Sequence, residues 1–200
     1  PYVRRVFIGK GNGAGAARNA GIDAATGSLI VFLDSDDYLA PDALEKMLAR
    51  YIQVGGNRYI YCGWYGVRKN GDLIYGNPPS YTQHQMLEPG YGHAITALIP
   101  REWAAKVRFN ENLPSFEDVD FYVRCAKNGF CGEPVAEPLL YYRLGTGNRR
   151  PKTDKEIGNL EKIIYNLGKE EDMPGCCGSG GKSILAAKKI LSGIQSLESE

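Results

Sequence analysis

Three aspartates, Asp34, Asp36 and Asp37, directly follow the apolar run "LIVFL". Carboxylates this close repel one another and raise one another's pKa values unless a cation lies among them. Oxygen ligands in an Asp-x-Asp arrangement suit Mg²⁺ or Mn²⁺, which commonly bridge to substrate phosphates. The alternative is a solvated turn in which one aspartate caps the next helix. Because the acids end a hydrophobic segment rather than a polar loop, the sequence favours a metal site.

A second acidic pair, Glu117 and Asp118, opens the segment "FEDVDFYVRCAKNG". Acidic side chains in the first turn of a helix are stabilised by its macrodipole, so such a carboxylate can stay ionised and accept a proton. Taken alone, the pair is more typical of ordinary charge complementarity at a helix start.

The first half of the chain has the spacing of alternating strands and helices. We expect a strand over 3–9, a loop over 10–15, a helix over 16–27 and a strand over 28–33. That second strand has the continuous apolar character of a strand buried on both faces in a parallel sheet. The next helix is expected over 40–54, with an apolar stripe of Leu44, Met47, Leu48 and Tyr51. The alternation predicts a layered α/β domain.

The second half continues this pattern. Asn70-Gly71 between two β-rich runs predicts a hairpin. We expect a surface loop over 77–93, a strand over 94–100, a helix from 101, a helix over 116–129 and an extended segment over 133–144. The expected inward residues of the 116–129 helix are Phe121, Val123, Cys125 and Ala126. Two further helices are predicted over 154–168 and 182–197, joined by a linker rich in Gly and Cys.

The bulk composition excludes several classes of protein. A net charge of +1 gives no electrostatic reason to expect a nucleic-acid partner. No apolar run approaches the roughly 18 residues of a membrane span. We expect no signal peptide, because the first residues lack the charged and then apolar pattern of one. Cys62, Cys125 and Cys131 are expected as buried reduced thiols of a cytoplasmic protein. The run "GCCGSGGKS" lacks the first glycine of a phosphate-binding loop, because Cys176 occupies its place.

Two long segments resemble family 2 glycosyltransferases of GT-A fold. These are "GNGAGAARNAGIDAATGSLIVFLDSDDYLAPDALEKML" and "FNENLPSFEDVDFYVRCAKNGF". The first matches the family's Ala-Arg-Asn-x-Gly helix and its strand ending in Leu-Asp-x-Asp-Asp. The second matches the family segment in which a Glu-Asp pair opens a helix. The resemblance covers about residues 1–145, and it implies a GT-A-like α/β mixed sheet flanked by helices.

The resemblance also implies a role for each matching residue. It implies a metal-dependent inverting transfer of sugar from a nucleotide-diphospho-sugar, with a UDP-sugar as the expected donor and a carbohydrate or other hydroxyl as acceptor. Asp36 would be the main ligand of Mn²⁺ or Mg²⁺, with Asp34 and Asp37 beside it. Asp118 would be the catalytic base, with Glu117 as its neighbour. Arg18 would help to hold the donor or the acidic loop, and Asn19 and Asp34 are the other residues expected to bind the donor. Apart from the resemblance, Trp64 is the aromatic residue expected to stack on the acceptor, with packing as the alternative. His93 precedes the strand over 94–100 and could approach the acceptor, although an ordinary loop histidine is the favoured interpretation.

Some features depart from the family pattern. The family's opening strand–helix–strand, which ends in Asp-Asp, has no counterpart here, so we expect an N-terminally truncated domain over 1–150. Gly145 and Thr146 stand where family members often carry a histidine. Residues 151–200 are expected to form a helical extension that could contact a partner chain or a second copy. Two alternatives remain: a degenerate, non-catalytic binding or assembly module, and a metal-dependent phosphotransferase or hydrolase.

Overall fold

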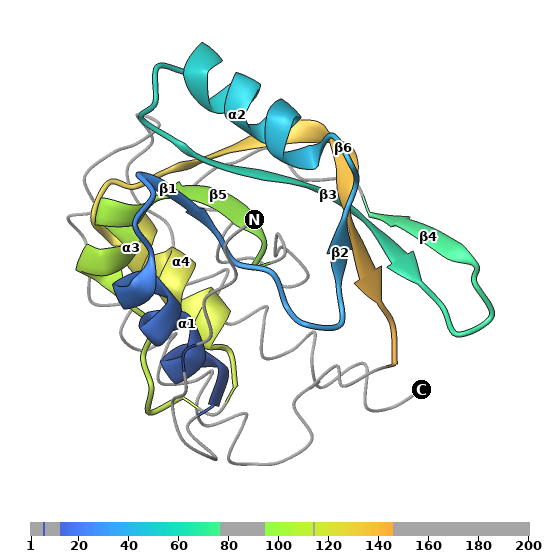
Figure 1. Ribbon diagram of the computed structural model, residues 1–200, viewed down its shortest axis with the longest axis horizontal. Helices are drawn as coiled ribbons and strands as arrows, with labels where there is room; N and C mark the ends of the chain where they lie inside the picture. The colour runs from blue at the N-terminus through green and yellow to red at the C-terminus, as the bar shows by residue number, and fades with distance from the viewer. Residues whose placement is uncertain (1–5, 7–12, 77–94, 114, 146–200) are drawn as a thin grey trace, which may run out of the picture.

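The computed structural model describes residue 6 and residues 13–76, 95–113 and 115–145. The predicted extension over 151–200, the possible partner contact through it and His93 lie outside the described residues. Within them the chain is an α/β structure (Figure 1) whose elements follow in this order: α1 (Gly13–Ala24), β1 (Leu29–Val31), β2 (Tyr38–Leu39), α2 (Ala43–Gln53), β3 (Tyr59–Val67), β4 (Leu73–Gly76), β5 (Ala97–Pro100), α3 (Arg101–Val107), α4 (Glu117–Lys127) and β6 (Gly132–Arg143).

The strands form one mixed sheet in the order β1-β5-β3-β6-β2, with β4 paired to β3. The pair β3–β6 is parallel, and the other described pairs are antiparallel. We predicted that residues 28–33 form a strand of a parallel sheet, buried on both faces. This prediction is wrong for the strand pair that the structure describes. β1 spans three half-buried residues and pairs antiparallel with β5. The predicted hairpin is confirmed, since β3 and β4 flank a turn at Gly71 with φ of 89°.

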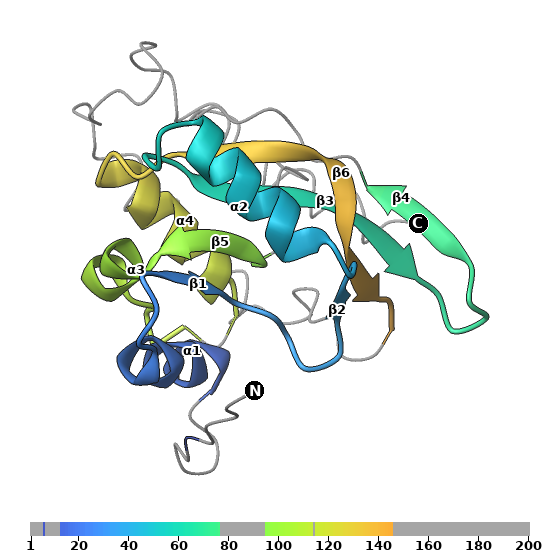
Figure 2. The same cartoon turned by 45° about the horizontal axis from the view of Figure 1, so that its top comes forward.

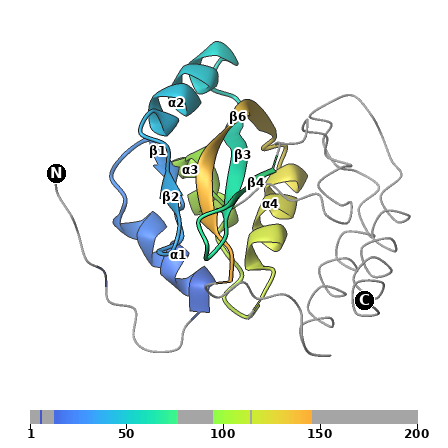
Figure 3. The same cartoon turned by 90° about the vertical axis from the view of Figure 1, so that its right-hand side faces the viewer.

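Helices cover both faces of the sheet. Figures 2 and 3 show α2 on one side of β3 and β6, with α4 on the other. The alternation of side chains along β3 explains the two cores. Ile60 and Cys62 pack with Ala43 and Met47 of α2, whereas Tyr59 and Tyr61 belong to the cluster shared with α1, α3 and α4.

An aromatic cluster joins the end of β1 to α4. The ring of Phe109 stacks on Phe121 of α4 with centroids 4.2 Å apart. Phe32, just after β1, meets Phe109 edge-on at 5.1 Å and Phe121 at 6.0 Å. Buried aromatic pairs of this kind add to the burial of apolar area. The cluster therefore fixes the acidic loop after β1 relative to the first turn of α4.

Helix α1 begins earlier than the sequence predicts. It starts at Gly13, so the expected loop over 10–15 is wrong at residues 13–15. Its inward residues are Gly15, Ala16, Asn19 and Ile22. A Cβ on Gly15 would lie 3.4 Å from the Asn110 carbonyl oxygen, so the small residue permits close packing against the segment after α3.

The predicted apolar stripe of α2 is only partly correct. Met47 is buried, but Leu44 and Leu48 are 53% and 43% exposed. Ala43, Met47 and the partly buried Tyr51 follow one another at intervals of four and make the contact with the sheet. Leu44 and Leu48 stand one residue further on, which turns them about 100° away around the helix.

The predicted inward residues of α4 are confirmed, because Phe121, Val123, Cys125 and Ala126 are all buried.

Cys62 and Cys125 are free, buried thiols, and burial raises the pKa of Cys62 to about 11. The prediction of a reduced thiol is wrong for Cys131, which is buried and disulfide-bonded. The cytoplasmic location stays a prediction. No helix in the described part of the chain is long and apolar enough to cross a membrane.

Candidate active site

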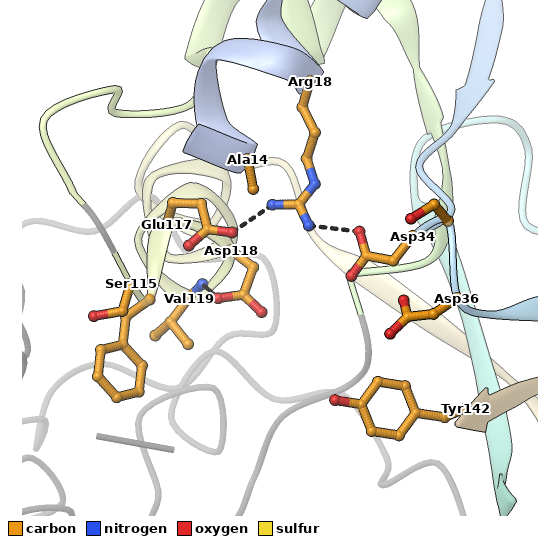
Figure 4. A pocket seen from close by; sticks show the side chains of 11 residues that line it. Ala14, Arg18, Asp34, Asp36, Ser115, Glu117, Asp118, Val119 and Tyr142 are labelled. Carbon is orange, nitrogen blue, oxygen red and sulfur yellow. Dashed lines mark hydrogen bonds and ion pairs between the residues drawn. The ribbon is translucent and has the colours of Figure 1, made fainter. Parts of the chain in front are cut away.

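A cavity of about 560 Å³ lies where the first turns of α1 and α4 meet the loop after β1 (Figure 4). Its lining brings together acidic residues that are far apart in the sequence. The residues that line it are Ala14, Arg18, Asp34, Ser35, Asp36, Ser115, Phe116, Glu117, Asp118, Val119 and Tyr142. The predicted residues Arg18, Asp34, Asp36, Glu117 and Asp118 therefore share one cavity.

The Arg18 side chain links the two acidic segments. Its Nη1 donates to Glu117 Oε1 at 2.6 Å, and its Nη2 donates to Asp34 Oδ1 at 2.8 Å. The side chain is 12% exposed, and its guanidinium lies 5.4 Å from the centre of the Phe109 ring. Burial alone would lower the pKa of Arg18, but the hydrogen bonds and charges of the two carboxylates raise it instead. Arg18 therefore supplies part of the positive charge that the crowded acids require.

Asp36 and Asp37 lie in different surroundings. Asp36 lines the cavity, whereas Asp37 Oδ1 accepts a hydrogen bond at 3.0 Å from the backbone N–H of Arg143 in β6. Burial raises the pKa of Asp37 to about 6 against the effect of this hydrogen bond, and the charges of Asp36 and Asp34 raise it further. The described residues contain no group of three or more carboxylate, His or Cys side chains placed to hold an ion. Of the three predicted metal ligands, Asp34 and Asp36 are the two that face the cavity.

Asp118 occupies the first turn of α4 beside Glu117. Its Oδ1 accepts a hydrogen bond at 2.8 Å from the backbone N–H of Val119. Burial raises the pKa of Asp118, and the negative charge of Glu117 adds to that effect. The preceding residue, Phe116, has left-handed backbone angles (φ 61°, ψ 21°), an unusual conformation for a bulky side chain. This turn starts the helix on the cavity wall, so that Asp118 lies across from Asp36 (Figure 4).

Asn19 is buried and does not belong to the cavity lining. Its Nδ2 donates to the Phe109 carbonyl oxygen at 3.0 Å and to Glu111 Oε1 at 2.7 Å. Its Oδ1 accepts from the Phe109 N–H at 2.8 Å. The structure thus places Asn19 away from the predicted substrate contact. One residue along a helix is a rotation of about 100°, so Asn19 faces the core when Arg18 faces the cavity.

The predicted aromatic residue, Trp64, stands behind the cavity and is not among its lining residues. Tyr142 of β6 lines the cavity, and Trp64 meets its ring edge-on with centroids 6.3 Å apart. The sequence could have indicated Tyr142 through its place beside the family's missing histidine. Ser35 lies between Asp34 and Asp36, and Ser115 and Phe116 directly precede Glu117. Only these positions beside predicted residues could have indicated from the sequence that they line the cavity.

Residues 2–110 match the sequence model of the family described as "Glycosyl transferase family 2". The match covers more than half of the chain. This chain belongs to glycosyl transferase family 2. The resemblance stated from the two motifs is therefore confirmed. Five motif residues of this family 2 chain line one cavity, namely Arg18, Asp34, Asp36, Glu117 and Asp118.

Known relatives extend the match beyond residue 110. The amylovoran biosynthesis glycosyltransferase AmsB of Erwinia amylovora is 33% identical over 145 residues, which cover 68% of this chain and 48% of AmsB. The uncharacterized glycosyltransferase MJ1057 of Methanocaldococcus jannaschii is 26% identical over 156 residues, covering 75% of this chain and 51% of that protein. The family 2 chain thus spans about half the length of these relatives.

A solved structure confirms the fold class. The crystal structure of S. aureus TarS residues 1–349 in complex with UDP-GlcNAc superimposes with a TM-score of 0.62 at 18% identity. The match covers 94% of this chain and 54% of that chain. The described domain therefore has the predicted GT-A-like α/β architecture, with a mixed sheet flanked by helices.

Proposed function

We propose that the protein containing this chain is a metal-dependent inverting glycosyltransferase. It transfers a sugar from a nucleotide-diphospho-sugar to an acceptor hydroxyl. The observation that carries the proposal is the shared cavity of Asp36, after β1, and Asp118, in the first turn of α4. We assign Asp36 to the leaving diphosphate and Asp118 to the attacking hydroxyl.

Asp118 is the proposed general base. An acceptor hydroxyl is a weak nucleophile, and a carboxylate within hydrogen-bond reach takes its proton as it attacks. Burial raises the pKa of Asp118, which makes its carboxylate a better proton acceptor than an exposed aspartate. Its bond to the Val119 N–H fixes one carboxylate oxygen. Direct attack from the side opposite the diphosphate inverts the anomeric carbon.

Arg18 and Glu117 position this base. Glu117 is held by Arg18, so its carboxylate is less available for proton transfer than that of Asp118. Arg18 also holds Asp34 of the acidic loop, which keeps the two walls of the cavity at a fixed separation. Asn19 contributes indirectly, because it fixes the Phe109 backbone beneath the Arg18 guanidinium.

The carboxylates fit one particular kind of metal site. Mg²⁺ is usually held by one or two carboxylates together with substrate phosphates rather than by an all-protein cage. Asp36 and Asp34 offer that number of cavity-facing carboxylates, whereas Asp37 is bonded to β6. A bound Mg²⁺ or Mn²⁺ would stabilise the negative charge that develops on the departing diphosphate.

The expected donor is a UDP-sugar, and the expected acceptor is a carbohydrate or another hydroxyl compound. The TarS structure that shares this fold was solved with UDP-GlcNAc, which supports the donor class. The name of AmsB, an amylovoran biosynthesis glycosyltransferase, supports glycosyl transfer in a biosynthetic role.

Turnover of UDP-sugars by the full-length protein tests the proposal. UDP release from UDP-GlcNAc, UDP-glucose and UDP-galactose is measured with Mn²⁺ or Mg²⁺ for the wild type, Asp118→Asn and Asp36→Asn. Both variants should lose about 100-fold or more of the turnover. Asp72→Asn, in the exposed hairpin turn, is the matched control. Donor binding without turnover would favour the non-catalytic module, and release of inorganic phosphate would favour a phosphotransferase or hydrolase.

A further inference from the structure

Tyr142 brings an aromatic ring into an otherwise acidic cavity. It comes from the last part of β6, on the wall opposite α4. Figure 4 shows the ring entering beside Asp36, with its hydroxyl directed toward the side on which Asp118 and Val119 lie. Tyr142 is thus a cavity residue from a fourth part of the chain, separate from α1 and from both acidic segments.

Trp64 of β3 supports the Tyr142 ring from behind. The two rings meet edge-on at 6.3 Å. Trp64 in turn lies over Gly76, its register partner on β4. A Cβ built on Gly76 would stand 2.2 Å from the Trp64 ring, so no side chain fits there unless the indole moves. The absence of a side chain at Gly76 therefore leaves room for the Trp64 ring, which packs against the ring of Tyr142.

The phenol group of a tyrosine is protonated at neutral pH. A protonated phenol donates a hydrogen bond, and its ring offers an apolar face. A ring that combines both properties suits a sugar, which presents hydroxyl oxygens at its edges and C–H groups on its faces.

The proposed chemistry defines what must lie next to Tyr142. In a direct displacement, the anomeric carbon lies between the departing diphosphate and the attacking hydroxyl. Asp36 is proposed to serve the first group and Asp118 the second, so the transferred sugar occupies the space between them. Tyr142 lines that same space.

We propose that Tyr142 is a specificity-determining residue that contacts the transferred sugar, and that Trp64 over Gly76 is its positioning support. The inference rests on the proposed function, and it adds that β6 recognises the sugar part of the donor. The donor has two parts, the sugar and the nucleotide. Tyr142 recognises the sugar, and it contributes nothing to binding of the nucleotide alone.

Calorimetry on the full-length protein with Mg²⁺ tests this separation. The dissociation constants of UDP and of the tightest binder among UDP-GlcNAc, UDP-glucose and UDP-galactose are compared. Tyr142→Ala should weaken UDP-sugar binding by about tenfold, and Tyr142→Phe by about threefold, with UDP binding within twofold of the wild type. Tyr141→Phe is the control, because Tyr141 packs against Tyr38 and Tyr65 and does not line the cavity.

The positioning role has its own test. Gly76→Ala should weaken UDP-sugar binding about as much as Tyr142→Phe and leave UDP binding unchanged, while Gly21→Ala, where an added Cβ meets nothing within 4 Å, should alter neither. In a Trp103→Phe background, the fluorescence of Trp64 should shift in the Gly76→Ala variant. Tyr142→Phe retains the ring, so it decides the question even where Tyr142→Ala or Gly76→Ala fails to fold.

Three results would overturn the inference. The first is an unchanged ratio of UDP-sugar to UDP affinity in both Tyr142 variants. The second is an equal loss of both ligands in Tyr142→Phe, which would indicate a general structural role. The third is a loss of UDP-sugar affinity in Tyr141→Phe as large as that in Tyr142→Phe. A wild type that binds neither UDP nor any of the three UDP-sugars would overturn the proposed function itself, and this inference with it.

Discussion

Arg18 of α1 forms an ion pair of 2.6 Å with Glu117 of α4, a residue 99 positions further along the chain. The same guanidinium holds Asp34, after β1, at 2.8 Å. Three segments of the cavity wall are therefore joined through one cation. The arrangement explains how the acidic loop can be so crowded, because a protein cation already offsets part of its charge before any ligand binds.

Arg18→Ala should lower the free energy of unfolding by about 3 kcal/mol, because it leaves two carboxylates facing each other without their cation. Glu117 is largely buried, which makes the loss larger than that of a surface ion pair. Denaturation by urea, followed by circular dichroism, measures the difference. Arg18→Lys should retain part of the stability, since it keeps the charge but not the two-pronged geometry.

Arg108→Ala is the control for Arg18→Ala. Arg108 also pairs with an acid of α1, Asp23, but both partners are exposed. Removal of such a pair should cost less than about 1 kcal/mol. Equal losses in the Arg18 and Arg108 variants would contradict the assigned role of Arg18 as the central link of the cavity.

Asn19→Ala should destabilise the protein by about 2 kcal/mol, because it leaves the buried N–H and carbonyl groups of Phe109 without their partner. The loss is measured by urea denaturation. Asn128→Ala is the matched control, because Asn128 is exposed and its amide donates one bond to the Arg124 carbonyl. If the two variants were equally stable, the bonds between Asn19 and Phe109 would not anchor α1.

Local patterns in the sequence were sufficient to predict most elements and the main cavity residues. The periodicity of "FEDVDFYVRCAKNG" gave the buried face of α4, and Asn70-Gly71 gave the hairpin between β3 and β4. Both are short-range features, in which neighbouring residues determine the structure. The two acidic motifs placed Asp36 and Asp118 correctly in one cavity because a family resemblance supplied the long-range relation between them.

Contacts between distant segments could not be predicted in this way. The sequence gives no reason to pair Arg18 with Glu117, or to place the Asn19 amide on the Phe109 backbone. The place of Tyr142 in the cavity lining has the same origin. The neighbours of each ring on β3 and β6 depend on the parallel register of the two strands, which follows from tertiary structure.

Asp118→Asn should stabilise the protein at neutral pH while it removes activity. Burial raises the folded-state pKa of Asp118 above its ordinary value of 3.8. Its contribution to stability is therefore fully favourable below that value and is lost as the pH rises through the raised pKa. Asparagine carries no charge at any pH, so the variant escapes this loss. Urea denaturation at neutral pH and at acidic pH measures the difference, which should vanish under acidic conditions.

The neighbouring carboxylate gives the opposite result. Glu117→Gln weakens the ion pair with Arg18, so this variant should be less stable than the wild type at neutral pH. As the pH is lowered, turnover of the wild type should begin to fall at a pH above the ordinary pKa of aspartate, because the base must be ionised. A less stable Asp118→Asn variant would show that Asp118 makes a favourable interaction as an ion, against the raised pKa.

Metal removal should abolish turnover, and the dependence on metal should separate Asp36 from Asp37. Excess EDTA is expected to stop UDP release from a UDP-sugar, and added Mn²⁺ or Mg²⁺ to restore it. Asp36→Asn should raise the Mn²⁺ concentration needed for half-maximal turnover by about tenfold or more, because a cavity-facing carboxylate is lost. Asp37→Asn should raise it by less than about threefold, since Asp37 bonds to the backbone of Arg143 and lies outside the cavity lining.

The two adjacent aspartates make this comparison sharp, because the substitutions change the charge of the same loop equally. A purely electrostatic effect of the loop would raise the Mn²⁺ concentration needed for half-maximal turnover to the same extent in both variants. Direct ligation by Asp36 alone predicts unequal effects. Equal shifts in the two variants would contradict direct ligation by Asp36, and turnover that survives EDTA in the wild type would remove the metal from the proposed mechanism.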